Sequence, residues 1–180
     1  MTIARLRKLA VGLSALTAAL TVTAAGASTA HAAGAFNVIT NAATHLCAKP
    51  QLNAESSLVL ARCPQPADNS EDARSARWLF QTVRGNFGHL VNQAGLGLCV
   101  YMNGPVSSGS PVIQTGCSDV SNEDWIGPVP NRAVVTTIKS RAGHRETNLC
   151  LAPESLQEGA LLRIFTCVGG DTSQQWFTGP

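Results

Sequence analysis

Beyond its first 32 residues, the chain alternates short apolar runs with polar turns, and no run keeps the 3.6-residue period of a helix. Runs rich in β-branched residues and bounded by Gly, Pro and Asn are typical of strands. They recur at 36–39, 58–60, 89–92, 112–114, 134–138 and 161–165. The pattern therefore predicts an all-β domain that spans residues 33–180.

One order of features occurs three times in this domain. A Leu-Cys pair opens it, a polar turn and a strand lead to a second cysteine, and a tryptophan with an apolar neighbour closes it. The tryptophans of the chain are Trp78, Trp125 and Trp176, and all three occupy this closing position. We define the first, second and third units as about 36–80, 88–127 and 134–178. A single unit cannot bury its own apolar face, so we expect three units, with about twelve strands, to pack around tryptophans in a shared core.

The first 32 residues have the features of a secretory signal peptide. Arg5, Arg7 and Lys8 precede an apolar stretch, and Ala30-His31-Ala32 supplies the small residues of a cleavage site. An N-terminal membrane anchor is the less favoured alternative, because the stretch contains several hydroxyl residues. We expect cleavage after Ala32 and a secreted protein of bacterial origin.

The six cysteines follow the same repeat. Within the three units they lie 16, 18 and 17 residues apart. An even number of cysteines in an exported chain indicates a disulfide framework, and the repeat selects one pairing. The predicted bridges are Cys47–Cys63, Cys99–Cys117 and Cys150–Cys167. No C-x-x-C pair occurs, so we expect no metal site and no cofactor.

Charge and motifs exclude several functions. The net charge of +2 comes from the leader, because residues 33–180 carry 10 basic and 11 acidic residues. A body near neutrality argues against nucleic-acid binding, which needs a basic surface. No nucleophile or zinc-protease motif appears, and neighbouring acids such as Glu123 and Asp124 are expected in a solvated turn rather than across a cleft. We therefore expect no enzyme activity and, after cleavage of the leader, no membrane partner.

This pattern resembles the ricin-type β-trefoil lectin family over residues 36–177. The resemblance rests on the three units, the Leu-Cys openings, the local cysteine pairs, the run Gly109-Ser110-Pro111-Val112 and the closing Gln174-Gln175-Trp176. It implies a trefoil that binds sugars in shallow pockets, up to one in each unit.

Several positions depart from the family pattern. Where the family usually has an aspartate two residues after the first cysteine, this chain has Lys49, Tyr101 and Ala152. The aromatic residue that usually stands two residues before the second cysteine is kept only as Phe165. Of the closing Asn-Gln-x-Trp motif, the second unit keeps its asparagine and the third keeps its glutamine.

The resemblance therefore leaves five candidate carbohydrate-binding residues and, beside them, one further possible acceptor. The third unit offers Phe165 for stacking, Gln174, and Glu154 as a substitute acceptor that reaches inward; the second offers Asn122 and Tyr101, with Glu123 as a possible acceptor. Gln174 has an alternative role, capping backbone groups of a turn. The expected function is weak binding of a glycan or polysaccharide.

The first unit suggests an alternative function. Between its second cysteine and its tryptophan it carries a polar insertion, residues 64–77, that the other units lack. Insertions in repeat proteins often lie on a binding face. The alternative is a degenerate trefoil that has lost its sugar sites and binds a protein, as an inhibitor does, through the loop around 68–72.

Overall fold

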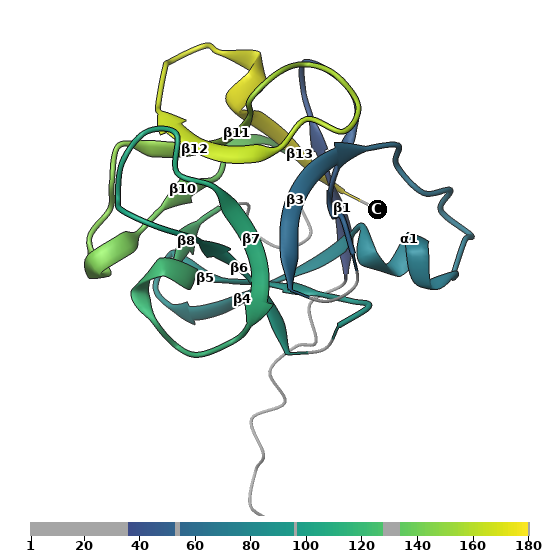
Figure 1. Ribbon diagram of the computed structural model, residues 1–180, viewed down its shortest axis with the longest axis horizontal. Coiled ribbons are helices and arrows are strands. Elements are labelled where there is room, and N and C mark those ends of the chain that lie inside the picture. The colour runs from purple at the N-terminus through teal and green to yellow at the C-terminus, as the bar shows by residue number, and fades with distance from the viewer. Residues whose placement is uncertain (1–35, 53–54, 96, 128–133, 180) are drawn as a thin grey trace, which may run out of the picture. The chain divides into compact units, whose positions relative to one another are not determined.

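The computed structural model describes residues 36–52, 55–95, 97–127 and 134–179, so the predicted signal peptide lies outside the described residues. Strands dominate this part of the chain (Figure 1). The thirteen strands are β1 (Asn37–Asn41), β2 (Cys47–Pro50), β3 (Ser56–Ala61), β4 (Arg77–Arg84), β5 (Phe87–Asn92), β6 (Leu98–Met102), β7 (Val112–Gly116), β8 (Trp125–Ile126), β9 (Val134–Thr137), β10 (Lys139–Ser140), β11 (Leu149–Pro153), β12 (Leu162–Thr166) and β13 (Gln175–Gly179).

Helices in the described residues are short. The α-helix α1 (Glu71–Ser75) lies in the insertion of the first unit, and three 3-10 turns are η1 (Ser121–Glu123), η2 (Ala142–His144) and η3 (Thr172–Gln174). None of the helices in the described part of the chain has the length and apolar character that crossing a membrane requires. The expectation of an all-β domain is confirmed.

Antiparallel strand pairs form a hairpin within each unit and also join one unit to the next. Within each unit the strand with the first cysteine pairs with the strand leading to the second, as β2–β3, β6–β7 and β11–β12. Each tryptophan then pairs with a polar residue of the following unit. These partners are Asn92 for Trp78, Ser140 for Trp125 and Asn41 for Trp176. The pairing of Trp176 with Asn41 brings the last unit back to the first.

The turns between the hairpin strands also bind neighbouring units. The Gly109 N–H donates to the Ile164 carbonyl at 2.7 Å, and the Gly159 N–H donates to the Leu60 carbonyl at 2.8 Å. Strands β3 and β7 pair through Ser56 and Gln114 and lie side by side in Figure 1. The turn of each unit therefore rests against the second-cysteine strand of the next, in a cyclic order.

All three tryptophans lie in one hydrophobic core, as expected. Their exposed fractions are between 0% and 2%, and they pack with leucines, isoleucines and valines of all three units. Each indole N–H donates a 2.9 Å hydrogen bond to the carbonyl of the residue after the first cysteine of its unit. The acceptors are Ala48 for Trp78, Val100 for Trp125 and Leu151 for Trp176.

The cysteines form the three predicted disulfides, Cys47–Cys63, Cys99–Cys117 and Cys150–Cys167. Each bridge ties the two strands of one hairpin and closes a local loop. Bridges of this size stabilise a small domain by roughly 3 kcal/mol each, chiefly by restricting the unfolded chain.

Candidate functional site

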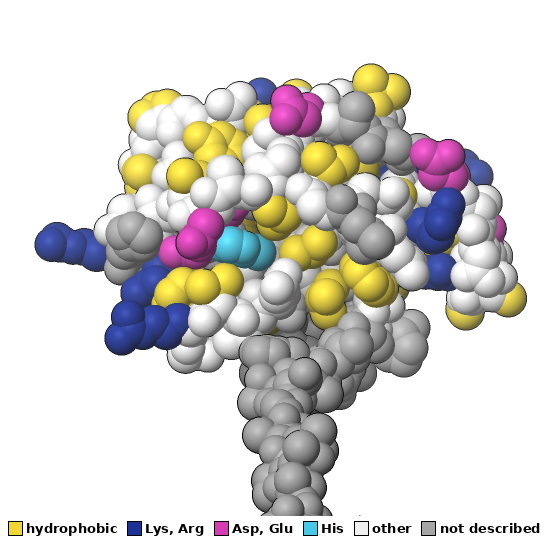
Figure 2. Space-filling view, turned by 90° about the horizontal axis from the view of Figure 1, so that it is seen from below, with side chains coloured by type: hydrophobic (Ala, Val, Ile, Leu, Met, Phe, Trp, Pro, Cys, Tyr) yellow, Lys and Arg dark blue, Asp and Glu magenta, His cyan; other side chains and the backbone are white. Residues whose placement is uncertain are grey.

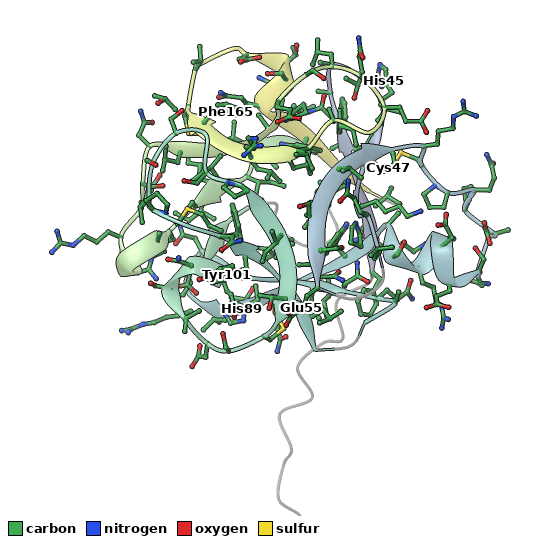
Figure 3. All side chains as sticks on the ribbon, in the orientation of Figure 1. His45, Cys47, Glu55, His89, Tyr101 and Phe165 are labelled. Carbon is green, nitrogen blue, oxygen red and sulfur yellow. A yellow bond between two sulfur atoms is a disulfide. The ribbon has the colours of Figure 1, made fainter. Side chains whose placement is uncertain are left out.

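The candidate site of the third unit lies on one face of the β11–β12 hairpin. Phe165 pairs with Cys150 and Arg163 pairs with Ala152, so these side chains share a face of the ladder. Phe165, which is labelled in Figure 3, is half-buried. Two residues along the strand, the Arg163 Nε donates to Glu154 Oε2 at 2.8 Å. The hairpin thus sets an aromatic ring beside a guanidinium–carboxylate pair.

Glu154 does not reach inward as an unoccupied acceptor. Its side chain is 40% exposed and engaged by Arg163, which also donates to the Gly109 carbonyl at 3.1 Å. Arg163 was not among the predicted site residues, although it is a charged residue two positions before Phe165 in an otherwise apolar strand.

The amide of Gln174 caps the turn after the third disulfide. Its Nε2 donates to the Thr166 carbonyl at 2.9 Å, and its Oε1 accepts from the Val168 N–H at 2.8 Å. The residue is only 4% exposed. Of the two roles considered for Gln174, the geometry therefore gives the turn cap.

Glu123 occupies the corresponding position of the second unit, two residues before its tryptophan. Its carboxylate accepts from the Ser118 N–H at 2.9 Å and from the Ser118 hydroxyl at 2.8 Å. Both Glu123 and Asp124 are buried, so the expectation of a solvated turn is wrong. The sequence concealed the burial of Asp124, because His89 and Arg141 beside it come from distant parts of the chain.

The outward face of the second unit carries Tyr101. Tyr101 pairs with Ile113 and is half-buried, on the same face as Thr115. The Thr115 hydroxyl donates to Glu55 Oε1 at 2.9 Å, which brings a carboxylate of the first unit to this hairpin. Tyr101 and Glu55 are both labelled in Figure 3. Glu55 was missed because nothing near it in sequence indicates a contact with residue 115.

Asn122, the other candidate of the second unit, supports the backbone. Its Nδ2 donates to the Met102 carbonyl at 3.2 Å, next to the position of Tyr101 on β6. The side chain is half-buried. One donor of the amide is therefore used by the fold.

His89 on β5 lies beside a buried carboxylate. Its Nε2 lies 3.4 Å from Asp124 Oδ1, and Arg141 Nη1 lies 3.7 Å from Asp124 Oδ2. His89, Cys99 and Glu123 also place possible metal-ligand atoms within 4.8 Å of one another. The Cys99 sulfur is already part of a disulfide, so this group retains only two available ligands.

In the first unit the sugar-binding position is occupied by an ion pair. Lys49 pairs with Asp72 of α1, so a cation stands where the family usually has a carboxylate. The insertion that carries α1 is held by Arg77, whose guanidinium donates to the carbonyls of Pro66 and Asp68 at 3.1 and 2.7 Å. A hollow of about 330 Å³ lies beside it, lined by Phe36, Asn37, Val38, Pro64, Pro66, Arg77 and Gln93.

One carboxyl of this insertion titrates below its ordinary range. The N–H of Ser70 donates to Asp68 at 2.8 Å. This bond and the Ser70 hydroxyl, with a smaller effect of the Arg77 charge, lower the pKa of Asp68.

Comparison with solved structures assigns the fold. A designed protein with threefold symmetry, ThreeFoil, has a TM-score of 0.65 at 16% identity, over 81% of this chain and 98% of its own. The C-terminal half of an earthworm R-type lectin, solved with GalNAc, has a TM-score of 0.60 at 11% identity, over 80% and 97%. A ricin B-like lectin of Macrolepiota procera, solved with lactose, has a TM-score of 0.56 at 14% identity, over 82% and 96%. The chain has the β-trefoil fold of these structures.

No family model matches the sequence, and no curated protein sequence matches it. Within the trefoil, the three positions that usually hold the sugar-binding aspartate are filled by a paired lysine, a half-buried tyrosine and a buried alanine. Two aromatic side chains lie at positions where the family usually has sugar-binding residues: Phe165 in the third unit and Tyr101 in the second. Each lies on a hairpin face that also carries a bound carboxylate, Glu154 or Glu55.

Proposed function

We propose that the protein is an exported carbohydrate-binding module that binds glycan or polysaccharide through the β11–β12 face of the third unit. The supporting observation is the half-buried Phe165 on the same face as the Arg163–Glu154 pair. An aromatic face stacks on the C–H side of a pyranose, while charged groups beside it bind the hydroxyls. Phe165 is the platform in this proposal, and Arg163 and Glu154 supply the polar contacts.

The polar contacts need no rearrangement of the fold. A carboxylate has two oxygens and several lone pairs, so Glu154 can accept from a sugar hydroxyl while it keeps its bond from Arg163. Gln174 acts indirectly, because its amide holds the turn that follows Phe165. The face is shallow and offers few contacts, so we expect a dissociation constant near millimolar, about −4 kcal/mol.

A second, weaker site is proposed on the β6–β7 face. Tyr101 supplies the aromatic surface, and Glu55 supplies the carboxylate that the second unit lacks in its own sequence. Both sites depend on the three-unit architecture, which we infer from the cyclic turn contacts and the matching indole hydrogen bonds. With two weak sites in one chain, avidity adds little unless the ligand is a polymer.

Export is part of the proposal. The basic and apolar leader predicts it, and three disulfides suit an oxidising compartment outside the cytoplasm.

Titration of the mature domain with galactose- and xylose-containing oligosaccharides, followed by calorimetry or protein NMR, tests the proposal. Phe165→Ala is expected to weaken binding about tenfold, the effect of losing one stacked ring. Phe177→Ala is the matched control, because Phe177 is an exposed ring on β13, away from the β11–β12 face. Equal loss in both variants, or no response of the parent protein to any sugar, would reject the site. The latter result would favour the alternative of a trefoil that binds a protein.

A further inference from the structure

A second hollow lies at the β4–β5 turn, apart from the residues of the proposed sugar sites. It measures about 540 Å³ and is lined by Arg84, Gly85, Asn86, Phe87 and Arg141. Small-molecule sites typically measure about 300–1,000 Å³. Figure 2 shows basic side chains gathered beside acidic groups and a histidine on the side seen from below. Two arginines therefore border one open recess on a body whose net charge is close to zero.

Arg141 is held in a defined position at this hollow. Its guanidinium carbon lies 3.7 Å from the centroid of the Phe87 ring, so the cation stacks on the aromatic face. Its backbone N–H donates to the Asp124 carbonyl at 2.9 Å, and its Nη1 lies 3.7 Å from Asp124 Oδ2. Phe87 and Asp124 are both buried. Because rigid groups hold Arg141, little side-chain freedom remains to be lost when a ligand binds.

The donors of both arginines are still available. Among the described residues, neither the Arg84 nor the Arg141 guanidinium donates a hydrogen bond. The ion pair of Arg141 with Asp124, at 3.7 Å, is too long to be one. Arg77 provides a contrast, because its guanidinium is spent on carbonyls of its own loop. A guanidinium with unspent N–H groups matches the spacing of two oxygens on a carboxylate or sulfate.

We infer that this hollow binds the oxyanion of an acidic saccharide, either a uronate carboxylate or a sulfate ester. Arg141 faces the oxyanion from its fixed position over Phe87, and the exposed Arg84 side chain contributes the second cation. The Asn86 amide at the tip of the turn can donate to a neighbouring hydroxyl. The saccharide part of this ligand rests on the proposed function, whereas the oxyanion part rests on the arginines alone. Acidic polymers would then engage the hollow independently of the Phe165 face.

Calorimetric titration of the mature domain tests this inference with four probes: an oligogalacturonate, a sulfated galactan oligosaccharide, a neutral galactan oligosaccharide of equal length, and inorganic sulfate. The acidic oligosaccharides are expected to bind at least about tenfold more tightly than the neutral one at low salt, and to lose this advantage as sodium chloride is raised. Preference for the uronate or for the sulfated probe identifies which oxyanion the hollow prefers.

Variants test whether the preference for acidic saccharides depends on the arginines of the hollow or on other charges of the protein. Arg84→Gln and Arg141→Gln are each expected to remove most of the acidic preference, at roughly tenfold, while binding of the neutral oligosaccharide is unchanged. Arg74→Gln is the control, because it removes an equal charge from the exposed side of α1. Thermal unfolding checks that each variant is folded. If the Arg141 variant does not fold, the Arg84 variant still tests the hollow, because Arg84 is exposed.

The outcomes distinguish the two proposals. Acidic binding that depends on Arg84 in a protein with no neutral binding would support the hollow and reject the Phe165 site. Neutral binding that depends on Phe165, with no acidic preference, would overturn the hollow and keep the Phe165 site. Equal loss in the Arg74 control, or binding of inorganic sulfate as tight as that of the sulfated saccharide, would overturn the inference.

Discussion

The role of Gln174 can be tested by replacing its amide with a carboxylate of the same shape. In Gln174→Glu the donor to the Thr166 carbonyl is lost, and a negative oxygen faces that carbonyl in a site only 4% exposed. A buried acceptor left without its donor costs about 1–3 kcal/mol, and a charge confined there adds to this. We expect a total loss near 3 kcal/mol in the free energy of unfolding, which lowers Tm by about 10 °C in a domain of this size.

Urea unfolding at pH 7, with linear extrapolation to water, measures this loss. Gln157→Glu is the matched control, because it makes the same substitution on an exposed turn. This variant should lose less than about 0.5 kcal/mol in the free energy of unfolding. The deficit of the Gln174 variant should shrink as the pH falls toward 4, since a protonated carboxyl regains a donor for the Thr166 carbonyl. A variant as stable as its parent, but with weaker sugar binding, would refute the turn-cap role and return Gln174 to the sugar site.

Three further variants test the scaffold. Trp125→Phe removes the donor to the Val100 carbonyl and should lower the free energy of unfolding by about 2–3 kcal/mol in urea titrations; a loss below 0.5 kcal/mol would contradict the hydrogen-bond argument. Replacing both members of Cys99–Cys117 by Ala should cost roughly 3 kcal/mol in the same assay, and an unchanged midpoint would speak against it. Asp68→Asn should lower Tm slightly at pH 7. A lowered folded-state pKa stabilises the fold fully above the ordinary carboxyl pKa, and this stabilisation is lost as the pH falls through the lowered pKa. The difference in Tm should therefore shrink steadily in acid, and a difference that does not shrink would refute this cause.

The scaffold was predictable because its determinants are local and periodic. The threefold repeat of the cysteine spacing selected the three bridges, and the shared position of Trp78, Trp125 and Trp176 placed them in one core. In each unit the indole acceptor lies 25 to 30 residues before the tryptophan, so one rule applies three times. Repetition gave three independent observations of each local preference, which a single copy would not supply.

The candidate sites were less predictable because their partners come from distant segments. Glu55 meets Thr115 across 60 residues, and no local pattern around either residue indicates the contact. Asp124 was expected in solvent, yet it is buried beside His89 and Arg141, which belong to other strands and turns. Side-chain burial at such places depends on how the units pack against one another, and a periodic pattern carries no information about individual cross-unit pairs.

The way the core is anchored explains how the positions of the family's usual aspartate can hold unrelated side chains without loss of the fold. The tryptophans bind backbone carbonyls of Ala48, Val100 and Leu151, whose own side chains lie in the core. The next residue on each strand points to the opposite face, so its side chain contributes nothing to this anchor. Those residues are Lys49, Tyr101 and Ala152, three chemically unrelated side chains at one structural position. The trefoil core is therefore compatible with side chains as different as these three, and binding must be judged from the hairpin faces rather than from the fold.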